Sequence, residues 1–151
     1  VALISDAGTP AISDPGRRLV AAARAAGHQV LAVPGPSALV AAVAASGLRA
    51  DRFAFLGFLP RTRSKMLAQL AAAPQLALVF YESPQRLAAT LEMASVALGA
   101  RRVAVAREIS KLHESWHLGT AAELAAEFRS TPPRGECTVV VEAPERRRPQ
   151  P

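Results

Sequence analysis

Short apolar runs alternate along the chain with longer segments in which apolar residues recur every three or four positions. The runs are typical of buried strands, and the longer spacing is typical of helices. We expect strands over residues 1–5, 29–33, 53–58, 76–81, 102–109 and 138–142, with 114–119 as a further candidate strand. We expect helices over residues 14–26, 38–46, 64–73, 83–98 and 120–129. This alternation predicts the α/β fold class.

Residues with helix-capping preferences support several of these helix starts. Asp14–Pro15 and Ser83–Pro84 each combine an N-cap residue with a proline suited to the first helical position. Thr120 and Glu123 have the spacing of a capping box, in which each side chain accepts a bond from the other residue's backbone. Gly27 follows the last apolar position of the first helix and is expected to end it.

The strand and helix pattern changes at residues 48–52, where we place a domain boundary. Residues 1–52 hold two successive strand–helix units, which predict part of a parallel sheet with right-handed crossovers. Residues 53–144 form the second α/β domain in this interpretation, with enough strands and helices to fold alone. Residues 145–151 form a basic tail that we expect to be disordered.

Composition narrows the function classes only modestly. The formal net charge is +6, which favours a polyanionic partner such as RNA, but three of the arginines lie in the tail at Arg146–Arg148. No apolar run is long enough to span a membrane. The chain has a single cysteine, Cys137, so it cannot form an internal disulfide, which is compatible with a reducing cytoplasm. We expect Cys137 to be a small residue of the core.

Two loops that follow predicted parallel strands are candidate ligand-binding elements. The first contains Asp6, Ala7, Gly8 and Thr9, and the second runs over residues 34–38 and includes Ser37 and Ala38. Open α/β sheets bind ligands at the carboxyl ends of their strands, where both loops are expected. Glycine allows a close approach of backbone to ligand, and free amides can hold a carboxylate or phosphate. A structured turn and close helix packing remain the alternatives.

Charged residues at two later strand ends form a third candidate site. Glu82 and Arg86 follow the strand over 76–81, and residues 107–114 combine acidic and basic side chains. Surface ion pairs are the alternative for each of them. His113 and His117 lack a cysteine or acidic partner at metal-binding spacing, so we expect no metal site.

Six sequence motifs occur in order along the chain and together cover about residues 1–143. They are SDAGTPAISDPG (5–16), VPGPSAL (33–39), DRFAFLGFLPR (51–61), FYESPQR (80–86), REISKLHE (107–114) and GECTVVVE (135–142). Taken together, they resemble the bacterial 16S ribosomal RNA cytidine 2′-O-methyltransferases of the tetrapyrrole-methylase-like superfamily.

The resemblance implies two α/β domains, part of a parallel sheet in the first and a mixed sheet in the second. It also implies that S-adenosylmethionine binds in the cleft between them. The residues matching the superfamily's cofactor loops are Asp6, Ala7, Gly8, Thr9, Ser37, Ala38, Phe80 and Tyr81.

The implied reaction is an in-line attack of a ribose oxygen on a sulfonium methyl group, which needs no metal and no protein nucleophile. Orientation of the reacting atoms supplies much of the rate. Glu108 is the first candidate for the base that removes the hydroxyl proton, and Glu82 is the second, because each leaves an apolar strand end. We expect the RNA phosphates to be positioned by Arg61, Arg63, Lys65 and Arg86.

The implied partner is 16S ribosomal RNA or the small ribosomal subunit, and the intact protein is expected to be a cytoplasmic homodimer that does not bind membranes. The superfamily's Gly- and Pro-rich loop on its first strand is not found here, and the chain opens on the strand-like Val1–Ser5 without methionine. We therefore expect upstream residues to precede Val1, and residues 1–151 alone to be inactive. Two alternatives remain open: a methylase of a tetrapyrrole or other small molecule, and a non-catalytic RNA-binding module.

Overall fold

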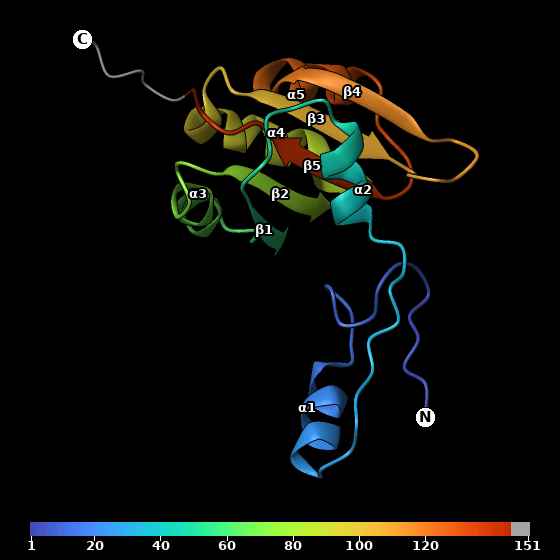
Figure 1. The fold of residues 1–151 in the computed structure, drawn as a ribbon. Coiled ribbons are helices and arrows are strands. Elements are labelled where there is room, and N and C mark those ends of the chain that lie inside the picture. The colour runs from blue at the N-terminus through green and yellow to red at the C-terminus, as the bar shows by residue number, and fades with distance from the viewer. Residues whose placement is uncertain (146–151) are drawn as a thin grey trace. The chain divides into compact units, whose positions relative to one another are not determined.

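The computed structural model describes residues 1–145 and divides into two compact units, Val1–Ala38 and the chain from Leu39 onward (Figure 1). The first unit contains a single helix among loops, α1 (Arg17–Ala25). The second contains four helices and a five-stranded sheet. Each unit has its own architecture and is described separately.

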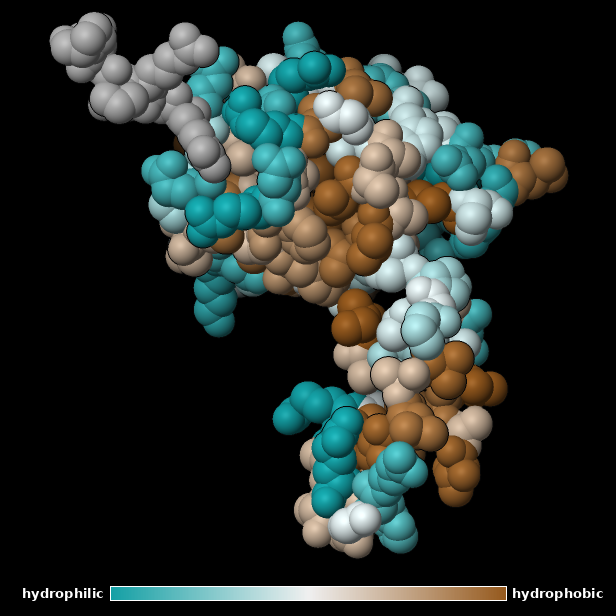
Figure 2. Space-filling model, viewed as in Figure 1, coloured by the Kyte–Doolittle hydropathy of each residue, from teal (hydrophilic) through white to brown (hydrophobic). Residues whose placement is uncertain are grey.

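In the first unit, the strands predicted over residues 1–5 and 29–33 are wrong. An extended segment becomes a strand only when its backbone groups pair with a neighbouring segment. Neither segment pairs in this way within residues 1–145. Its apolar side chains are consequently exposed, with Ile4, Leu31 and Val33 at 84%, 74% and 86% exposure, and Figure 2 shows apolar surface over much of this unit.

The N-cap of α1 is also different from the one expected. Gly16 caps the helix with a φ of 136°, a value that L-residues rarely adopt, and Val20 makes the first helical hydrogen bond to its carbonyl oxygen at 3.0 Å. Asp14 and Pro15 lie in the turn before it. The local signal therefore predicted a helix correctly but placed its start two residues early.

The sheet of the second unit is mixed, with strand order β1-β2-β5-β3-β4. β1 and β2 are parallel, whereas β5 runs antiparallel to both β2 and β3, and β4 runs antiparallel to β3. The strands are β1 (Phe53–Phe58), β2 (Ala77–Glu82), β3 (Arg102–Arg107), β4 (Ser115–Thr120) and β5 (Cys137–Val141). The α/β class and the mixed sheet expected from the sequence are confirmed.

Helices cover both faces of this sheet (Figure 1). One face packs against α3 (Arg63–Ala71), α4 (Pro84–Leu98) and α5 (Ala121–Ser130) around Phe80, which is fully buried. The other face packs against α2 (Ala38–Ala45) and the segment that follows it, through small residues such as Ala42. The capping box at the start of α5 is confirmed: Glu123 N donates to Thr120 Oγ1 at 3.3 Å, and Thr120 N donates to Glu123 Oε2 at 2.7 Å.

The contacts divide the chain after Ala38, whereas the sequence pattern places the domain boundary after residue 52. The intervening segment packs on the sheet of the second unit: Leu48 and Ala50 are buried, and Arg49 Nη2 donates to Ala143 O at 2.7 Å. The domain limits of the whole protein stay a prediction. Over residues 1–145, no helix combines the length and apolar character that a membrane span needs.

Cys137 lies in the core of the second unit with 3% exposure, and burial raises the pKa of its thiol to about 11. Only the thiolate reacts readily with disulfide reagents, so the folded protein offers little reactive form at pH 8. We expect no modification by Ellman's reagent over minutes at pH 8, and one full equivalent after addition of guanidinium chloride. Fast modification of the native protein would contradict this core position.

Candidate functional site

The two candidate loops of the first unit lie against each other. Thr9 Oγ1 donates to Pro36 O at 2.9 Å, which ties the first loop to the second across 27 positions of sequence. Beside this bond is a cavity of about 250 Å³ lined by Leu3, Ile4, Ser5, Gly8, Thr9, Pro10, Val33, Pro34 and Gly35. Small-molecule sites usually begin near 300 Å³, so this volume fits part of a ligand of ordinary size.

Gly8 has a physical reason to be glycine at this cavity. Its φ is 73°, in the left-handed region that L-residues rarely adopt, whereas a Cβ there would lie 3.7 Å from Pro36 O, an ordinary contact distance. Ser5 Oγ donates to Gly8 O at 3.1 Å and thereby fixes the turn. Asp6 and Ala7 are exposed in the same turn but do not line the cavity.

The residues of the second loop occupy different environments. Ser37 is half-buried, and Ala38 is exposed at the start of α2. Neither lines the cavity, whose second wall is formed by Val33–Gly35. The cavity-lining apolar positions, such as Leu3 and Val33, were not expected from the sequence, because the pattern placed them inside strands.

Phe80 and Tyr81, the predicted cofactor contacts at the end of β2, point to opposite faces of the sheet, as neighbours in a strand must. Phe80 is fully buried beneath the helices. Tyr81 is half-buried on the other face, where its ring meets Phe55 and Phe58 edge to face, with centroids 5.0 and 5.7 Å apart. Only Tyr81 presents part of its side chain to a ligand.

Glu82, the last residue of β2, is enclosed just before α4, with 2% exposure. Its carboxylate accepts bonds from Ser83 N at 2.8 Å and Thr90 Oγ1 at 2.7 Å, and Arg86 Nη2 lies 3.3 Å away. Arg86 Nη2 also donates to Leu59 O at 3.1 Å. Through these bonds, Glu82 and Arg86 connect the ends of β1 and β2 to α4. Glu82 is therefore poorly placed to accept a proton from a substrate.

Glu108 begins the loop between β3 and β4, with a positive φ of 50°. Its Oε1 accepts from Glu136 N at 2.7 Å and from Lys111 Nζ at 3.1 Å. The backbone bond from Glu136, followed by the bond from Lys111, holds the pKa of Glu108 below its ordinary value, so the carboxylate is ionised at neutral pH. Lys111 Nζ also donates to Glu136 Oε2 at 2.9 Å, and these bonds raise the pKa of Lys111.

Gly135 makes room for the Glu108 carboxylate. A Cβ on Gly135 would stand 2.3 Å from Glu108 Cδ, well inside the closest approach of real atoms, so a side chain there would displace Glu108. The sequence analysis missed Gly135 and Glu136 as partners of Glu108, although both lie in the quoted motif at residues 135–142.

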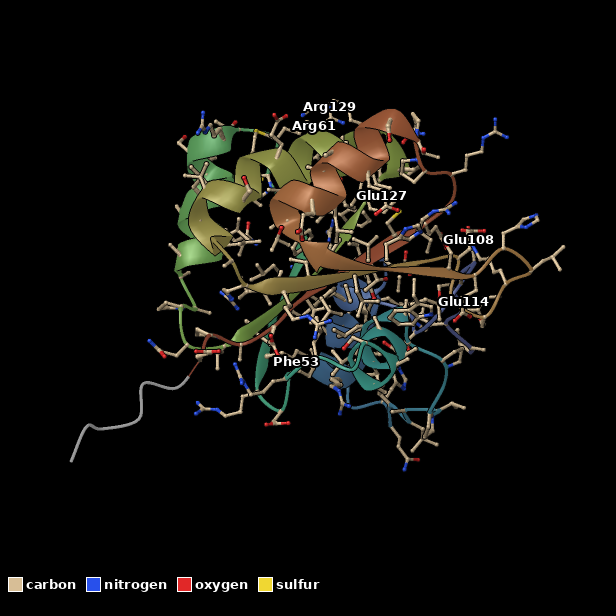
Figure 3. All side chains as sticks on the ribbon, turned by 90° about the horizontal axis from the view of Figure 1, so that it is seen from above. Phe53, Arg61, Glu108, Glu114, Glu127 and Arg129 are labelled. Atoms are coloured by element: carbon tan, nitrogen blue, oxygen red, sulfur yellow. The ribbon has the colours of Figure 1, made fainter. Side chains whose placement is uncertain are left out.

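The rest of the loop over residues 108–114 is held by Glu114. Its Oε2 accepts from Ser110 N at 2.6 Å, and its Oε1 accepts from Trp116 Nε1 at 2.8 Å. The Trp116 bond, followed by the Ser110 bond, lowers the pKa of Glu114. Figure 3 shows Glu108 and Glu114 at the same end of the sheet. The two glutamates of this loop therefore have separate sets of partners: Glu108 bonds to Lys111 and Glu136, and Glu114 bonds to Ser110 and Trp116.

His117 joins β4 to α5 instead of facing a metal. Its Nδ1 lies 2.6 Å from Glu127 Oε1, its Nε2 lies 3.2 Å from Ser115 Oγ, and its ring packs edge to face on Phe128. Arg107 Nη1 donates to the same Ser115 hydroxyl at 3.0 Å. Across residues 1–145, no group of three or more histidine, cysteine or acidic side chains is arranged to hold a metal ion.

The predicted RNA-contacting residues separate into two kinds. Arg86 is occupied by Glu82 and Leu59, as described above. Arg61, Arg63 and Lys65 are exposed after β1, and within the described part of the chain none of them makes an ion pair or side-chain hydrogen bond. We call these three residues the cationic segment.

The fold and the sequence together place the chain in a class of methylases. The sequence profile of the Tetrapyrrole (Corrin/Porphyrin) Methylases matches residues 1–125, and the chain belongs to this family. Among solved structures, the methyltransferase CobJ superposes with a TM-score of 0.69 at 21% identity, over 93% of this chain and 64% of that one. Uroporphyrin-III C-methyltransferase from Thermus thermophilus, complexed with S-adenosyl homocysteine, gives 0.59 at 21% identity, over 89% and 62%.

Curated relatives carry the name ribosomal RNA small subunit methyltransferase I, which confirms the resemblance drawn from the six motifs. The protein of Thermotoga maritima is 45% identical over 147 residues, which are 96% of this chain and 66% of that protein. The Pseudomonas aeruginosa protein is 48% identical over 153 residues, or 96% and 54%. The Mycobacterium tuberculosis protein is 50% identical over 145 residues, or 93% and 50%. The chain thus spans between half and two thirds of these relatives.

Proposed function

We propose that the protein transfers a methyl group from S-adenosylmethionine to the ribose 2′-hydroxyl of a cytidine in 16S ribosomal RNA. The observation that carries the proposal is the identity of 45–50% over nearly the whole chain to proteins named ribosomal RNA small subunit methyltransferase I. The six motifs support the finer assignment to the ribose hydroxyl. We further propose that the whole protein is a cytoplasmic homodimer that acts on the small ribosomal subunit.

The loops of the first unit fit part of the methyl donor. The cavity beside Gly8 and Thr9 is small, and its lining combines the hydroxyl-bearing Ser5 and Thr9 with apolar residues, which suits the apolar and polar parts of one small ligand. Asp6, exposed on the same turn, is available to accept a hydrogen bond from an amine or a sugar hydroxyl. We assign the remaining contacts to Ala7, Ser37, Ala38 and Tyr81 from the resemblance, and to Phe80 through its backbone alone.

When bound, the donor supplies an electrophilic methyl group on sulfonium. The protein's own residues have two tasks in this scheme: holding the ribose oxygen in line with that methyl, and accepting the hydroxyl proton. We assign the proton to Glu108, whose carboxylate is ionised at neutral pH and partly exposed at 19% of the side chain. Glu82 is the less favoured base, because its carboxylate is enclosed and already accepts several hydrogen bonds.

Replacing Gly8 by valine should weaken binding of S-adenosylmethionine at least about tenfold, or 1.4 kcal/mol. The branched side chain would occupy the cavity and would oppose the positive φ of this position. Isothermal titration calorimetry on the whole protein measures the change. The matched control is Gly27→Val, at a φ of 79° with no atom within 4 Å of the added Cβ and outside the cavity. Equal loss in both variants would show that backbone strain, not the cavity, is responsible.

Methylation of purified small ribosomal subunits with labelled donor tests the function as a whole. We expect one 2′-O-methylcytidine per 16S RNA, identified by mass spectrometry of nuclease digests. A base-methylated product would overturn the ribose assignment. The family's name and the uroporphyrin-III C-methyltransferase structure supply a second candidate, methylation of a tetrapyrrole; methyl transfer to a uroporphyrin with none to RNA would establish it. RNA binding without donor binding would indicate a non-catalytic module.

A further inference from the structure

Phe58, the last residue of β1, exposes an aromatic ring at the edge of the sheet. Its exposed fraction is 56%, and it belongs to neither cluster of core residues. β1 and β2 are parallel, so the ends of both strands lie together, and Phe58 pairs with Tyr81 in the register of the two strands. Ligands of open α/β sheets bind at this carboxyl edge. The ring therefore stands where a substrate can reach it.

A bulge in β1 determines which face of the sheet Phe58 occupies. The register advances from Phe55 opposite Val79 to Phe58 opposite Tyr81, so β1 contains one residue more than β2 over this stretch. Gly57, with a φ of 63°, provides the left-handed conformation that such a bulge needs. Without the extra residue, the side chain at position 58 would lie on the face that packs against α3, α4 and α5. The bulge instead brings Phe58 beside Tyr81.

Two side chains from the helices hold this part of β1 in place. Gln69 Nε2 donates to Leu56 O at 3.0 Å, and Arg86 Nη2 donates to Leu59 O at 3.1 Å. These bonds fix the backbone on both sides of Phe58. A rigid aromatic surface loses little conformational entropy when a ligand binds to it.

The charge beside Phe58 indicates what kind of ligand fits. Arg61, the first residue of the cationic segment, is three positions from Phe58, at most about 11 Å of extended chain. No aspartate or glutamate occurs between Arg52 and Glu82, so the surroundings in sequence are purely basic. An exposed aromatic ring next to free cations is the arrangement that binds single-stranded nucleic acid, with bases stacked on the ring and phosphates near the cations.

We propose that the ring of Phe58 is a stacking surface for an unpaired base of the RNA substrate, with the cationic segment binding the adjoining phosphates. This inference rests on the proposed function and adds a positioning residue to it. Stacking on a ring is tolerant of base identity, whereas the cations contribute a salt-dependent attraction. The two contributions are therefore separable by experiment.

Fluorescence anisotropy with a labelled 12-nucleotide single-stranded RNA tests the proposal on the whole protein. Phe58→Ala should weaken binding about five- to a hundredfold at every salt concentration and leave the salt slope unchanged. Phe58→Trp should bind within about twofold of the parent, and its added indole emission should be quenched by RNA. The matched control is Phe53→Ala, an exposed phenylalanine on the same strand and face, which Figure 3 shows far from Arg61.

The outcomes separate this inference from the proposed function. If Phe58→Ala binds like the parent while alanine replacement of the cationic segment weakens binding, the stacking surface is overturned and RNA binding stands. Equal losses for Phe58→Ala and Phe53→Ala would also overturn it. A change of oligomeric state in Phe58→Ala, measured by sedimentation, would assign the ring to a protein interface instead. If the parent binds no RNA, both the inference and the proposed function fail.

Discussion

Replacing Glu108 by glutamine in the whole protein should lower the kcat of RNA methylation about a hundredfold, with the KM for RNA changed less than about threefold. A positioned base contributes at least about this much to a proton transfer, and an amide of the same shape cannot accept the proton. We choose the lower end of the usual range because hydrogen bonds from Glu136 and Lys111 lower the pKa of Glu108 and make it a weaker base. Steady-state kinetics with small ribosomal subunits measures both constants.

The matched control for this variant is Glu136→Gln. It removes the second carboxylate from Lys111 Nζ but keeps the backbone N–H that holds Glu108. We expect less than a fivefold loss. If Glu108→Gln and Glu136→Gln lose activity equally, Glu108 only shapes the loop and the assignment as base is wrong.

The pH profile of the parent gives a further check on this assignment. The pKa of Glu108 is lowered from its ordinary value of 4.5, so the carboxylate is still ionised at pH 4.5. The methylation rate should therefore not fall on the acid side until the pH is below about 4.5. The same sign applies to stability: the contribution of Glu108 is present above its unfolded pKa and is lost as pH falls through the lower folded value. An activity limb near pH 6.5 would point to another group.

Replacing Arg61, Arg63 and Lys65 together by alanine should weaken RNA binding by up to about a hundredfold at 50 mM salt. Each exposed cation contributes at most about 1 kcal/mol, and the three are free to meet phosphates because none is engaged within residues 1–145. Each lost phosphate contact with a single strand should also reduce the slope of log K against log salt by about 0.7, so the total change is about 2.

Titrations at several salt concentrations measure this slope, and alanine replacement of Arg17, Arg18 and Arg24 serves as a matched control. Those three cations are also exposed, lie on α1 and have no role in the proposal. An unchanged slope after loss of the cationic segment would show that these residues are ordinary solvated charges. Equal changes in both variants would reveal a diffuse effect of net charge.

Local patterns predicted most of the second unit. Residues Phe53–Phe58 were predicted as a strand with the observed bounds, because an aromatic and apolar run needs only a neighbour to become a strand. The capping box of Thr120 and Glu123 was predicted because its two bonds connect residues three positions apart. The same reasoning failed for residues 1–5, whose apolar pattern is equally strand-like but which pair with nothing within residues 1–145.

The candidate site was predicted less completely, because its decisive contacts join distant residues. The sequence drew attention to Glu108 but not to its dependence on Gly135 and Glu136, some 28 positions away. It proposed Glu82 and Arg86 for chemistry, and only the three-dimensional structure shows that they bond each other and neighbouring groups. A glutamate at the end of a strand looks the same in the sequence whether its carboxylate is buried, as in Glu82, or exposed to a substrate.

The strand order of the sheet has a consequence for synthesis on the ribosome. Of the five strands of this sheet, β5 is the last in sequence, yet it lies in the centre, hydrogen-bonded to β2 on one side and β3 on the other. Until residues 137–141 emerge, β2 and β3 each have one edge without a hydrogen-bonded neighbour. Contacts of such long sequence separation form slowly. A nascent chain that stalls before Cys137 exposes Leu78, Phe80, Val103 and Val105, all fully buried in the finished sheet, and is a natural client for chaperones.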